Sequence, residues 1–297
     1  MTERKSILIY IEHADEHVAD VASAPQARIA AVASAPQARI ADVSLELTGK
    51  ARELADQLGR ASGGTYEVVG LLCGHNVEAL ADDVIAHGAD RVLLADHPEL
   101  ADYRTLPYAR VAIAEVRRLE PEIFLIGGTH NGRDLAPRVA SALRCGLTAD
   151  CTDLQIGDYY VKKEDRTHKN LLYQIRPAFG GNLIATIVNP GTRPQMATVR
   201  EGVMRMPAAD ATRKGVVEAV TPRFEPGDFA LEILSRQVRH STVHLKDAPV
   251  VVAGGAGMET AEEFDLLRDL ANLVGGEVGA SRAAVDAGLI GREHLIG

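Results

Sequence analysis

The sequence has few cysteines and no long apolar run, and each absence excludes a class of protein. Cys73, Cys145 and Cys151 form no CxxC pair, and an odd number in 297 residues does not indicate a disulfide framework, so we expect reduced, mostly buried thiols. The HExxH zinc motif is absent, which leaves metal binding without support. The apolar runs, such as residues 123–126 and 250–253, are far shorter than the ~18 residues that cross a bilayer, so we expect no membrane span.

The chain also lacks an excess of positive charge. It has 32 basic and 41 acidic residues, a net charge of −9, which argues against nucleic acid and anionic lipid as main partners. Its amino-terminal apolar stretch is too short for a signal peptide, so we expect a cytoplasmic protein. With 46% hydrophobic and 25% charged residues, the composition is that of one large folded domain or two ordinary ones.

An exact tandem duplication lies near the amino terminus. Residues 21–31 read VASAPQARIAA and residues 32–42 read VASAPQARIAD, a period of eleven residues. Two copies of an Ala-rich segment with a proline in each are too few and too short for a solenoid. We therefore interpret residues 21–42 as an insertion on the surface, between the first strand and its helix.

Strand-like and helix-like segments alternate through the first half of the chain. The apolar spacing predicts strands at residues 6–11, 66–72, 91–95 and 123–126, and helices at 44–58, 77–87, 106–119 and 135–143. Strands that are separated by single helices indicate an α/β fold with a mostly parallel, doubly wound sheet.

The pattern changes after Asp150. Short runs at residues 159–162, 171–176 and 183–188 predict antiparallel or mixed strands, and a helix-like patch follows near 229–238. The βα alternation then restarts, with strands at 250–253 and 277–279 and helices at 260–274 and 282–287. We predict an α/β domain I over residues 1–207, its remainder and a linker over 208–248, and the amino-terminal part of a second domain over 249–297.

A glycine loop follows the first strand of this second domain. Gly254, Gly255 and Gly257 would let the backbone approach a phosphate, next to the free N–H groups of a helix N-terminus. The third glycine of GxGxxG would fall on Thr260, so the motif is incomplete, and a plain tight turn stays open as the alternative.

Two further loops join strands to helices. Residues 127–134 contain GxxxxG without the Lys-Ser/Thr of a phosphate loop, so Arg133, Asp134 and Arg138 either form an ion-paired helix start or contact a ligand or subunit. In the other loop, Ser281 either caps the next helix or faces a ligand together with Arg282.

Several segments together resemble the α subunit of electron transfer flavoprotein. The resemblance covers the chain apart from the repeat. The segments that carry it are residues 44–55, 132–138 (GRDLAPR), 146–152 (GLTADCT), 176–182 (RPAFGGN), 193–200 (RPQMATVR), 251–257 and 278–288 (VGASRAAVDAG). The resemblance implies a nucleotide α-hydrolase-like domain I followed by the start of a Rossmann-like FAD-binding domain.

The resemblance also implies the function. The family carries electrons, using FAD in a heterodimer with a β subunit, between dehydrogenases of the acyl-CoA dehydrogenase type and an acceptor. Arg282 matches the arginine that lies against the flavin, and Ser281 matches its FAD-contacting neighbour. We expect Ala280 and the three glycines of the loop to complete the cofactor-binding set, with no catalytic and no metal-binding residue.

Departures from the family pattern limit these expectations. A Gln-Thr-Gly and a Gly-Ile-Ser-Gly-Ala-Ile-Gln-His stretch are expected beyond Gly297, so the resemblance implies that the last part of the FAD domain lies outside these residues. Ala256 and Leu295 stand where many members have arginine and glutamine. The GRDLAPR form is similar to bacterial members, including those that bifurcate electrons from NADH. A flavin-free α/β scaffold and a nucleotide-binding module stay open as alternatives.

Overall fold

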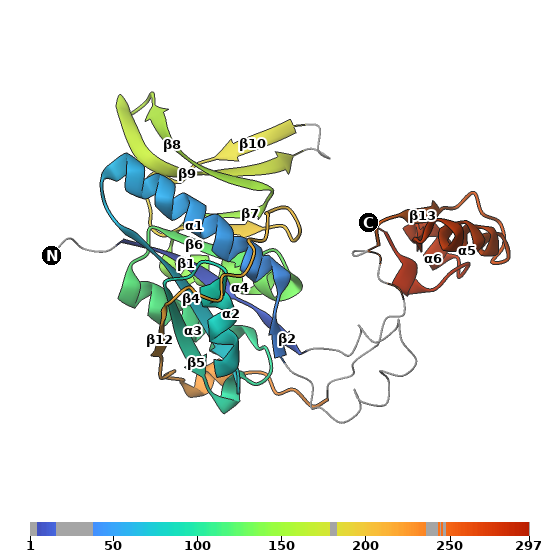
Figure 1. Ribbon diagram of the computed structural model, residues 1–297, viewed down its shortest axis with the longest axis horizontal. Helices are drawn as coiled ribbons and strands as arrows, with labels where there is room; N and C mark the ends of the chain where they lie inside the picture. Colours follow the sequence, from blue (N-terminus) through green and yellow to red (C-terminus); the bar gives the residue numbers. More distant parts are fainter. Residues whose placement is uncertain are drawn as a thin grey trace. The chain divides into compact units, whose positions relative to one another are not determined.

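The computed structural model describes residues 5–15, 38–178, 183–235, 243, 245 and 248–296. They fall into two compact units, which divide between Glu232 and Ile233 (Figure 1). The predicted domain boundaries near residues 207 and 248 stay a prediction. In the part of the chain that is described, no helix combines the length and the hydrophobicity that a bilayer crossing requires.

The first unit is built on a seven-stranded parallel sheet with the strand order β12-β5-β4-β1-β6-β11-β7. This architecture confirms the predicted α/β fold. The strands are β1 (Lys5–Ile11), β4 (Tyr66–Gly74), β5 (Arg91–Asp96), β6 (Ile123–Gly127), β7 (Leu147–Cys151), β11 (Gln195–Val199) and β12 (Val216–Ala219).

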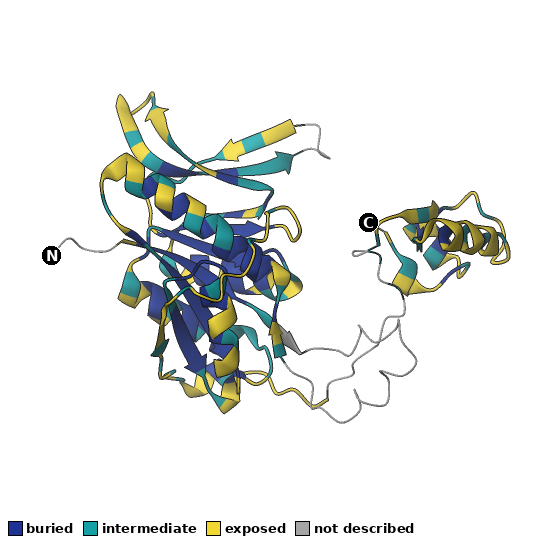
Figure 2. Ribbon diagram, viewed as in Figure 1, coloured by how far each residue is buried: buried dark blue, intermediate teal, exposed yellow. Residues whose placement is uncertain are grey.

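Helices cover both faces of this sheet, which is why its central strands are almost continuously apolar (Figure 2). In β1, Ile7, Ile9 and Ile11 pack on one face, with α1 (Asp42–Ser62) and α2 (Ala81–Ala86). Leu8 and Tyr10 pack on the other face, with α3 (Thr105–Leu119) and α4 (His130–Leu143). Short 3-10 turns at Glu78–Leu80 and Pro98–Leu100 precede α2 and α3.

Helix α4 begins five residues before the predicted start at residue 135. The hydroxyl of Thr129 accepts a hydrogen bond of 2.9 Å from the N–H of Gly132 and so caps the helix. Gly132 does not delay the helix, because the site requires glycine: a Cβ there would collide with the Gly127 carbonyl oxygen. This close approach packs α4 against the end of β6.

A three-stranded antiparallel sheet lies beside α1, and this confirms the predicted change of pattern after Asp150. Its order is β10-β9-β8, with β8 (Asp153–Val161), β9 (Arg166–Ala178) and β10 (Leu183–Ile187). Leu154 of β8 and Leu172 of β9 are buried in the same hydrophobic core as the apolar side chains of α1. Residues 179–182, between β9 and β10, lie outside the described residues.

The repeat is only partly described, since residues 16–37 lie outside the described part. The end of its second copy forms β3 (Ala38–Ile40), which pairs antiparallel with β2 (His13–Asp15). Ile40 is 3% exposed and belongs to the main core, and Asp42 is the first residue of α1. The prediction of a surface insertion is therefore wrong for Ile40, which packs in the core, whereas Arg39 and Asp42 are exposed.

The helix predicted near residues 229–238 does not form in the described residues 230–235. Instead, a short 3-10 turn at Pro226–Phe229 is the last regular element of the first unit in the described residues. Asp228 in this turn accepts hydrogen bonds from Arg110 on α3. Phe229 packs edge-on against Phe224, so side-chain contacts, not a helix, fix this segment.

The second unit is a βαβ element followed by two short helical turns. Its parts are β13 (Val251–Gly254), α5 (Glu263–Val274), β14 (Glu277–Ala280), α6 (Arg282–Asp286) and a 3-10 turn at Arg292–His294. The two strands pair in parallel, as the restart of the βα alternation predicted. Phe264 and Val278 lie in its small core. Leu295 forms a parallel bridge to Ala280 on the side of β14.

Candidate functional site

The carboxyl ends of β13 and β14 bring the predicted site residues together. Gly254 and Ala280 are register partners, so the glycine loop and the Ser281–Arg282 turn leave the sheet side by side. The N–H of Ser281 donates a hydrogen bond of 2.9 Å to the carbonyl oxygen of Gly254, which ties the two loops. Ligands of open α/β sheets bind outside this edge.

The glycines of the loop have different roles. A Cβ at Gly254 would lie 2.6 Å from atoms of both Phe264 and Leu267, so glycine is needed there for packing against α5. A Cβ at Gly255 would approach only the Ser281 hydroxyl, at 3.6 Å, and one at Gly257 would meet no atom within 4 Å. The space over Gly257 is open to a ligand.

The expected phosphate site at the N-terminus of the following helix is not formed. Helix α5 begins at Glu263, three residues later than predicted and well beyond the glycine loop. Its first turn is acidic, with Glu262 as the N-cap residue and Glu263 and Asp265 after it. These carboxylates oppose a phosphate at this terminus. The loop can therefore offer its backbone to a ligand, but not this helix dipole.

The side chain of Ser281 has an unusual environment for a polar group. Its backbone has the extended conformation of an N-cap residue, yet its hydroxyl makes no capping hydrogen bond to α6. The Oγ atom is buried and has no partner in the described part of the chain. Buried hydroxyl groups are normally paired, so an unpaired one is typical of a site whose partner comes from outside.

Arg282 lies next to this hydroxyl in sequence and faces solvent. Its side chain is 83% exposed, and its Nε donates to Asp286, one turn later on α6, at 3.3 Å. An exposed pair of this kind contributes little to stability. The guanidinium is therefore available to a ligand, and the alternative of a purely structural helix start gains no support from its contacts.

Ala280 contributes backbone only. Its methyl group is fully buried in the core of the second unit. Its carbonyl oxygen already accepts a hydrogen bond of 2.9 Å from Ile296. Any role of Ala280 toward a ligand is therefore to fix the position of the neighbouring Ser281.

The first unit has its own switch point, where the strand order reverses between β1 and β6. Glu12 directly follows β1, and its carboxylate accepts hydrogen bonds from Thr129 Oγ1 at 2.6 Å and Asn131 Nδ2 at 3.0 Å. Burial raises the pKa of Glu12, and these two hydrogen bonds offset only part of that rise. Since Thr129 is the N-cap residue of α4, the protein's own carboxylate occupies the usual anion position. This arrangement, which the sequence analysis missed, counts against a nucleotide in this unit.

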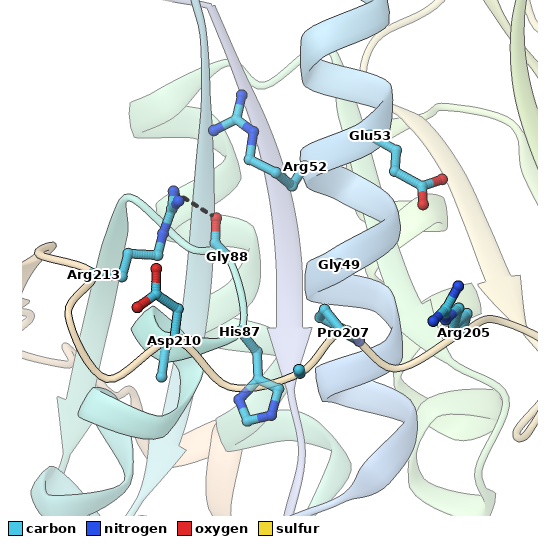
Figure 3. Close-up of a pocket in the computed structure, with 11 residues that line it drawn as sticks. Gly49, Arg52, Glu53, His87, Gly88, Arg205, Pro207, Asp210 and Arg213 are labelled. Carbon is cyan, nitrogen blue, oxygen red and sulfur yellow. Dashed lines mark hydrogen bonds between the residues drawn. The ribbon is translucent and has the colours of Figure 1, made fainter.

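A cavity of about 420 Å³ also lies in the first unit, beneath the segment that connects β11 to β12 (Figure 3). Arg52 and Arg213 line it, and both bind Asp90, at 2.7 and 2.6 Å. Arg213 also donates to the Gly88 carbonyl oxygen at 3.0 Å, the bond drawn in Figure 3. Asp90 precedes β5, so the cavity lies at the amino edge of the sheet, away from the ligand edge. Its charges hold the connecting segment in place.

The described residues contain no group of three or more side chains placed to hold a metal ion. The three cysteines are free, as predicted, with Cys73 and Cys151 buried and Cys145 partly buried. Burial raises the pKa of Cys151 to about 12, so its thiol is protonated at neutral pH and is a poor nucleophile.

Comparison with known proteins supports the second unit as the site. Residues 29–224 match the family model of the electron transfer flavoprotein domain, and residues 244–297 match that of the electron transfer flavoprotein FAD-binding domain.

The chain is similar to several named proteins. It is 44% identical over 256 residues to electron transfer flavoprotein subunit alpha of Thermoanaerobacterium thermosaccharolyticum, covering 86% of this chain and 73% of that protein. It is 37% identical over 255 residues to lactate dehydrogenase (NAD(+),ferredoxin) subunit LctC of Acetobacterium woodii, covering 86% and 57%. It is 36% identical over 271 residues to acryloyl-CoA reductase electron transfer subunit beta of Anaerotignum propionicum, covering 85% and 72%.

Proposed function

The chain belongs to the electron transfer flavoprotein α-subunit family, and from this premise we propose that the carboxyl edge of β13 and β14 is where it holds FAD. The observation that carries the proposal is the buried, unpaired Oγ atom of Ser281. It lies 3.6 Å from the position of a Cβ on Gly255, in the same loop as Gly257, where a Cβ would meet no atom within 4 Å. A hydroxyl without a partner and a backbone without side chains fit a ligand that has both polar groups and a flat ring system.

The residues of the site have separate tasks in this proposal. FAD supplies the redox chemistry, accepting electrons from a donor and passing them to an acceptor. Gly255 and Gly257 allow close approach of the backbone, and Ser281 supplies a hydrogen bond that the protein itself does not satisfy. Ala280 holds Ser281 in position through the pairing of its strand with β13.

Arg282 provides the fixed positive charge. A cation beside a group that gains an electron stabilises the reduced form by Coulomb attraction, about 4 kcal/mol for unit charges ~4 Å apart at an effective dielectric constant near 20. The Arg282 side chain is 83% exposed and its pair with Asp286, at 3.3 Å, is exposed too, so the positive charge is available to a ligand. We assign Arg282 to raising the reduction potential of the bound flavin.

The partners follow from the family. We propose a heterodimer with an electron transfer flavoprotein β subunit in the cytoplasm and, as electron donor, a dehydrogenase of the acyl-CoA dehydrogenase type. Two relatives are named as subunits of an NAD- and ferredoxin-dependent lactate dehydrogenase and of an acryloyl-CoA reductase. Their names favour an electron-bifurcating role, in which NADH is used together with the β subunit.

The test is to purify the full chain together with its β subunit and to record the absorption spectrum. We expect flavin bands, and we expect Ser281→Ala to weaken FAD binding without lowering the stability of the second unit, because the hydroxyl makes no internal hydrogen bond. Ser62→Ala in α1 is a matched control, since that hydroxyl bonds Leu58 within the protein. A complex without flavin bands would favour the flavin-free scaffold.

A further inference from the structure

Four of the family-like segments of the first unit each contribute one charged residue to the same region. Residues 132–138, 146–152, 176–182 and 193–200 are far apart in the sequence, and each contributes one charged side chain to a single group. We call this group the Asp150 cluster, and it consists of Arg133, Asp150, Arg176 and Arg200.

Asp150 is at the centre of the cluster. Arg200 binds it through two hydrogen bonds, Nε to Oδ1 at 3.1 Å and Nη2 to Oδ2 at 2.7 Å. Arg133, in the first turn of α4, reaches Oδ1 at 3.6 Å. The hydrogen bonds of Arg200, helped by the charges of Arg133 and Arg176, lower the pKa of Asp150. The acid is therefore ionised at neutral pH, and two guanidinium groups contact its carboxylate. Arg176 adds a third positive charge nearby, since the carbonyl oxygen of the preceding Ile175 accepts a hydrogen bond of 2.8 Å from the N–H of Thr152.

The backbone holds Asp150 in this central position. Its φ of +62° is in the left-handed region, which few residues other than glycine adopt. Its N–H donates to Thr198 Oγ1 at 3.0 Å, and the N–H of Arg200 donates to the Cys151 carbonyl oxygen at 2.9 Å. The ends of β7 and β11 thus fix the two charges together, at the carboxyl edge of the sheet.

The charge of the cluster is not explained by the stability of the fold. Arg200 alone gives Asp150 a bidentate partner, which is the strongest geometry available to a carboxylate. Adding two more cations leaves a local charge of about +2, in a chain whose net charge is −9. Like charges held close together repel each other. Negative charge supplied by a partner would relieve this repulsion.

The exposure of the arginines favours a protein surface as the source of that charge. The side chains of Arg133 and Arg200 are 62% and 46% exposed, so they are accessible to a large partner. Asp150 already takes the bidentate face of Arg200, and a small anion would have to compete with it. Carboxylates on a partner protein can instead meet the outer N–H groups of the arginines while Asp150 stays in place.

We propose that the Asp150 cluster is a contact surface for acidic side chains of the β subunit. The inference rests on the heterodimer in the proposed function. Its consequence is electrostatic: the cluster speeds the encounter of the two subunits and fixes their register, and these effects weaken as salt is added. It also accounts for the GRDLAPR segment, whose Arg133 is a subunit contact in this proposal.

The test measures binding of the β subunit to the full chain by biolayer interferometry at low and high ionic strength. For Arg133→Glu we expect the association rate at low salt to fall about tenfold, with a weaker salt dependence. For Asp150→Asn, which makes the cluster more positive, we expect faster association. Arg39→Glu is the matched control, because Arg39 is 60% exposed and lies 3.4 Å from a carboxylate, that of Asp42.

The possible outcomes distinguish a failure of the Asp150-cluster proposal from a failure of the proposed function. Unchanged association of Arg133→Glu, or an equal loss in Arg39→Glu, would overturn the inference and leave the proposed function intact. If the wild-type chain failed to bind the β subunit, both would fall. If inorganic phosphate displaced the β subunit from the wild type but not from a variant with altered cluster charge, the cluster would be a small-anion site and the proposal would be wrong.

Discussion

Gly254 and Ala280 are register partners at the last positions of β13 and β14, and their pairing sets the two loops of the proposed FAD site beside each other. Gly254 and Gly257 differ in their surroundings. A Cβ at Gly254 would lie 2.6 Å from atoms of Phe264 and Leu267, whereas a Cβ at Gly257 would meet no atom within 4 Å. Packing and ligand approach can therefore be separated by two alanine substitutions.

We predict that Gly254→Ala destabilises the second unit by about 1–3 kcal/mol, because the added methyl group overpacks the core. Gly257→Ala should leave its stability unchanged and lower its affinity for FAD. The two units need not unfold together, so stability is measured by hydrogen exchange of the amides in residues 251–280. FAD content follows from absorbance.

Gly191→Ala is the control for these variants, because a Cβ there also meets no atom within 4 Å and the residue lies in the first unit. It should retain both stability and flavin. Full FAD affinity in Gly257→Ala would show that the ligand does not approach this part of the backbone.

The repeat permits an unusually well-matched pair of deletions. Removing residues 21–31 or residues 32–42 leaves one copy, and the two products differ only in the residue before Val43, which is Asp in the first and Ala in the second. We predict that both fold, since either copy supplies the Ala-Arg-Ile of β3 and loop closure depends weakly on length.

The deletion that leaves Ala should be the less stable by about 0.3–1 kcal/mol, because an acidic residue in the first turn of α1 favours the helix. Thermal unfolding measures this difference. Ile40→Ala in the product that lacks residues 21–31 is the contrast and should cost about 2–5 kcal/mol. A fall of more than ~5 °C in the product that keeps Asp, roughly 1 kcal/mol in an ordinary domain, would show that the core needs both copies.

Two glutamates at opposite edges of the large sheet should respond oppositely to pH. Burial raises the pKa of Glu12 above its usual 4.5. Burial alone would also raise the pKa of Glu122, but its hydrogen bonds with Lys5 and Arg193 lower it. An acid whose pKa is raised by folding holds its proton more tightly in the folded state than in the unfolded state. The free energy of unfolding therefore falls as pH rises above ~4.5 and the acid loses this proton.

We therefore predict that the free energy of unfolding of Glu12→Gln, relative to wild type, increases as pH rises from about 4.5 through the raised pKa. For Glu122→Gln the relative free energy should fall as pH rises through the lowered pKa toward 4.5. Urea titrations of the first unit across this range give both slopes, with each variant as the other's control. Equal slopes would mean that the two carboxyl groups have similar surroundings.

Much of the fold was predictable because its central strands are apolar runs covered on both faces. The strands that the sequence analysis missed lack this pattern. In β11, Gln195 and Thr198 are buried although they are polar, and β12 is short and mostly exposed. Both join the sheet through pairing with distant strands, which a local pattern does not reveal. The start of α4 was missed because Gly132 is typical of a loop, and here it serves close packing.

The candidate site was predicted in part. The glycine loop and the Ser281–Arg282 turn were found from their positions after strands, and parallel pairing explains why they meet. The sequence alone did not distinguish capping from ligand binding by Ser281, because that depends on whether its Oγ atom bonds the helix. The Asp150 cluster combines four distant segments, so its geometry depends on the tertiary fold.

The reduction potential of the flavin in Arg282→Ala, measured in the complex of the full chain with its β subunit, shows whether the Arg282 charge acts on the flavin. We predict that FAD still binds and that the potential for the first electron falls by tens of millivolts, where 59 mV is a tenfold change in a one-electron equilibrium. Arg282→Lys should restore most of the potential, and Arg268→Ala, which removes a half-exposed arginine from α5, should leave it unchanged. An unchanged potential in Arg282→Ala, in a complex that retains its flavin, would contradict the assignment of Arg282 to the redox site.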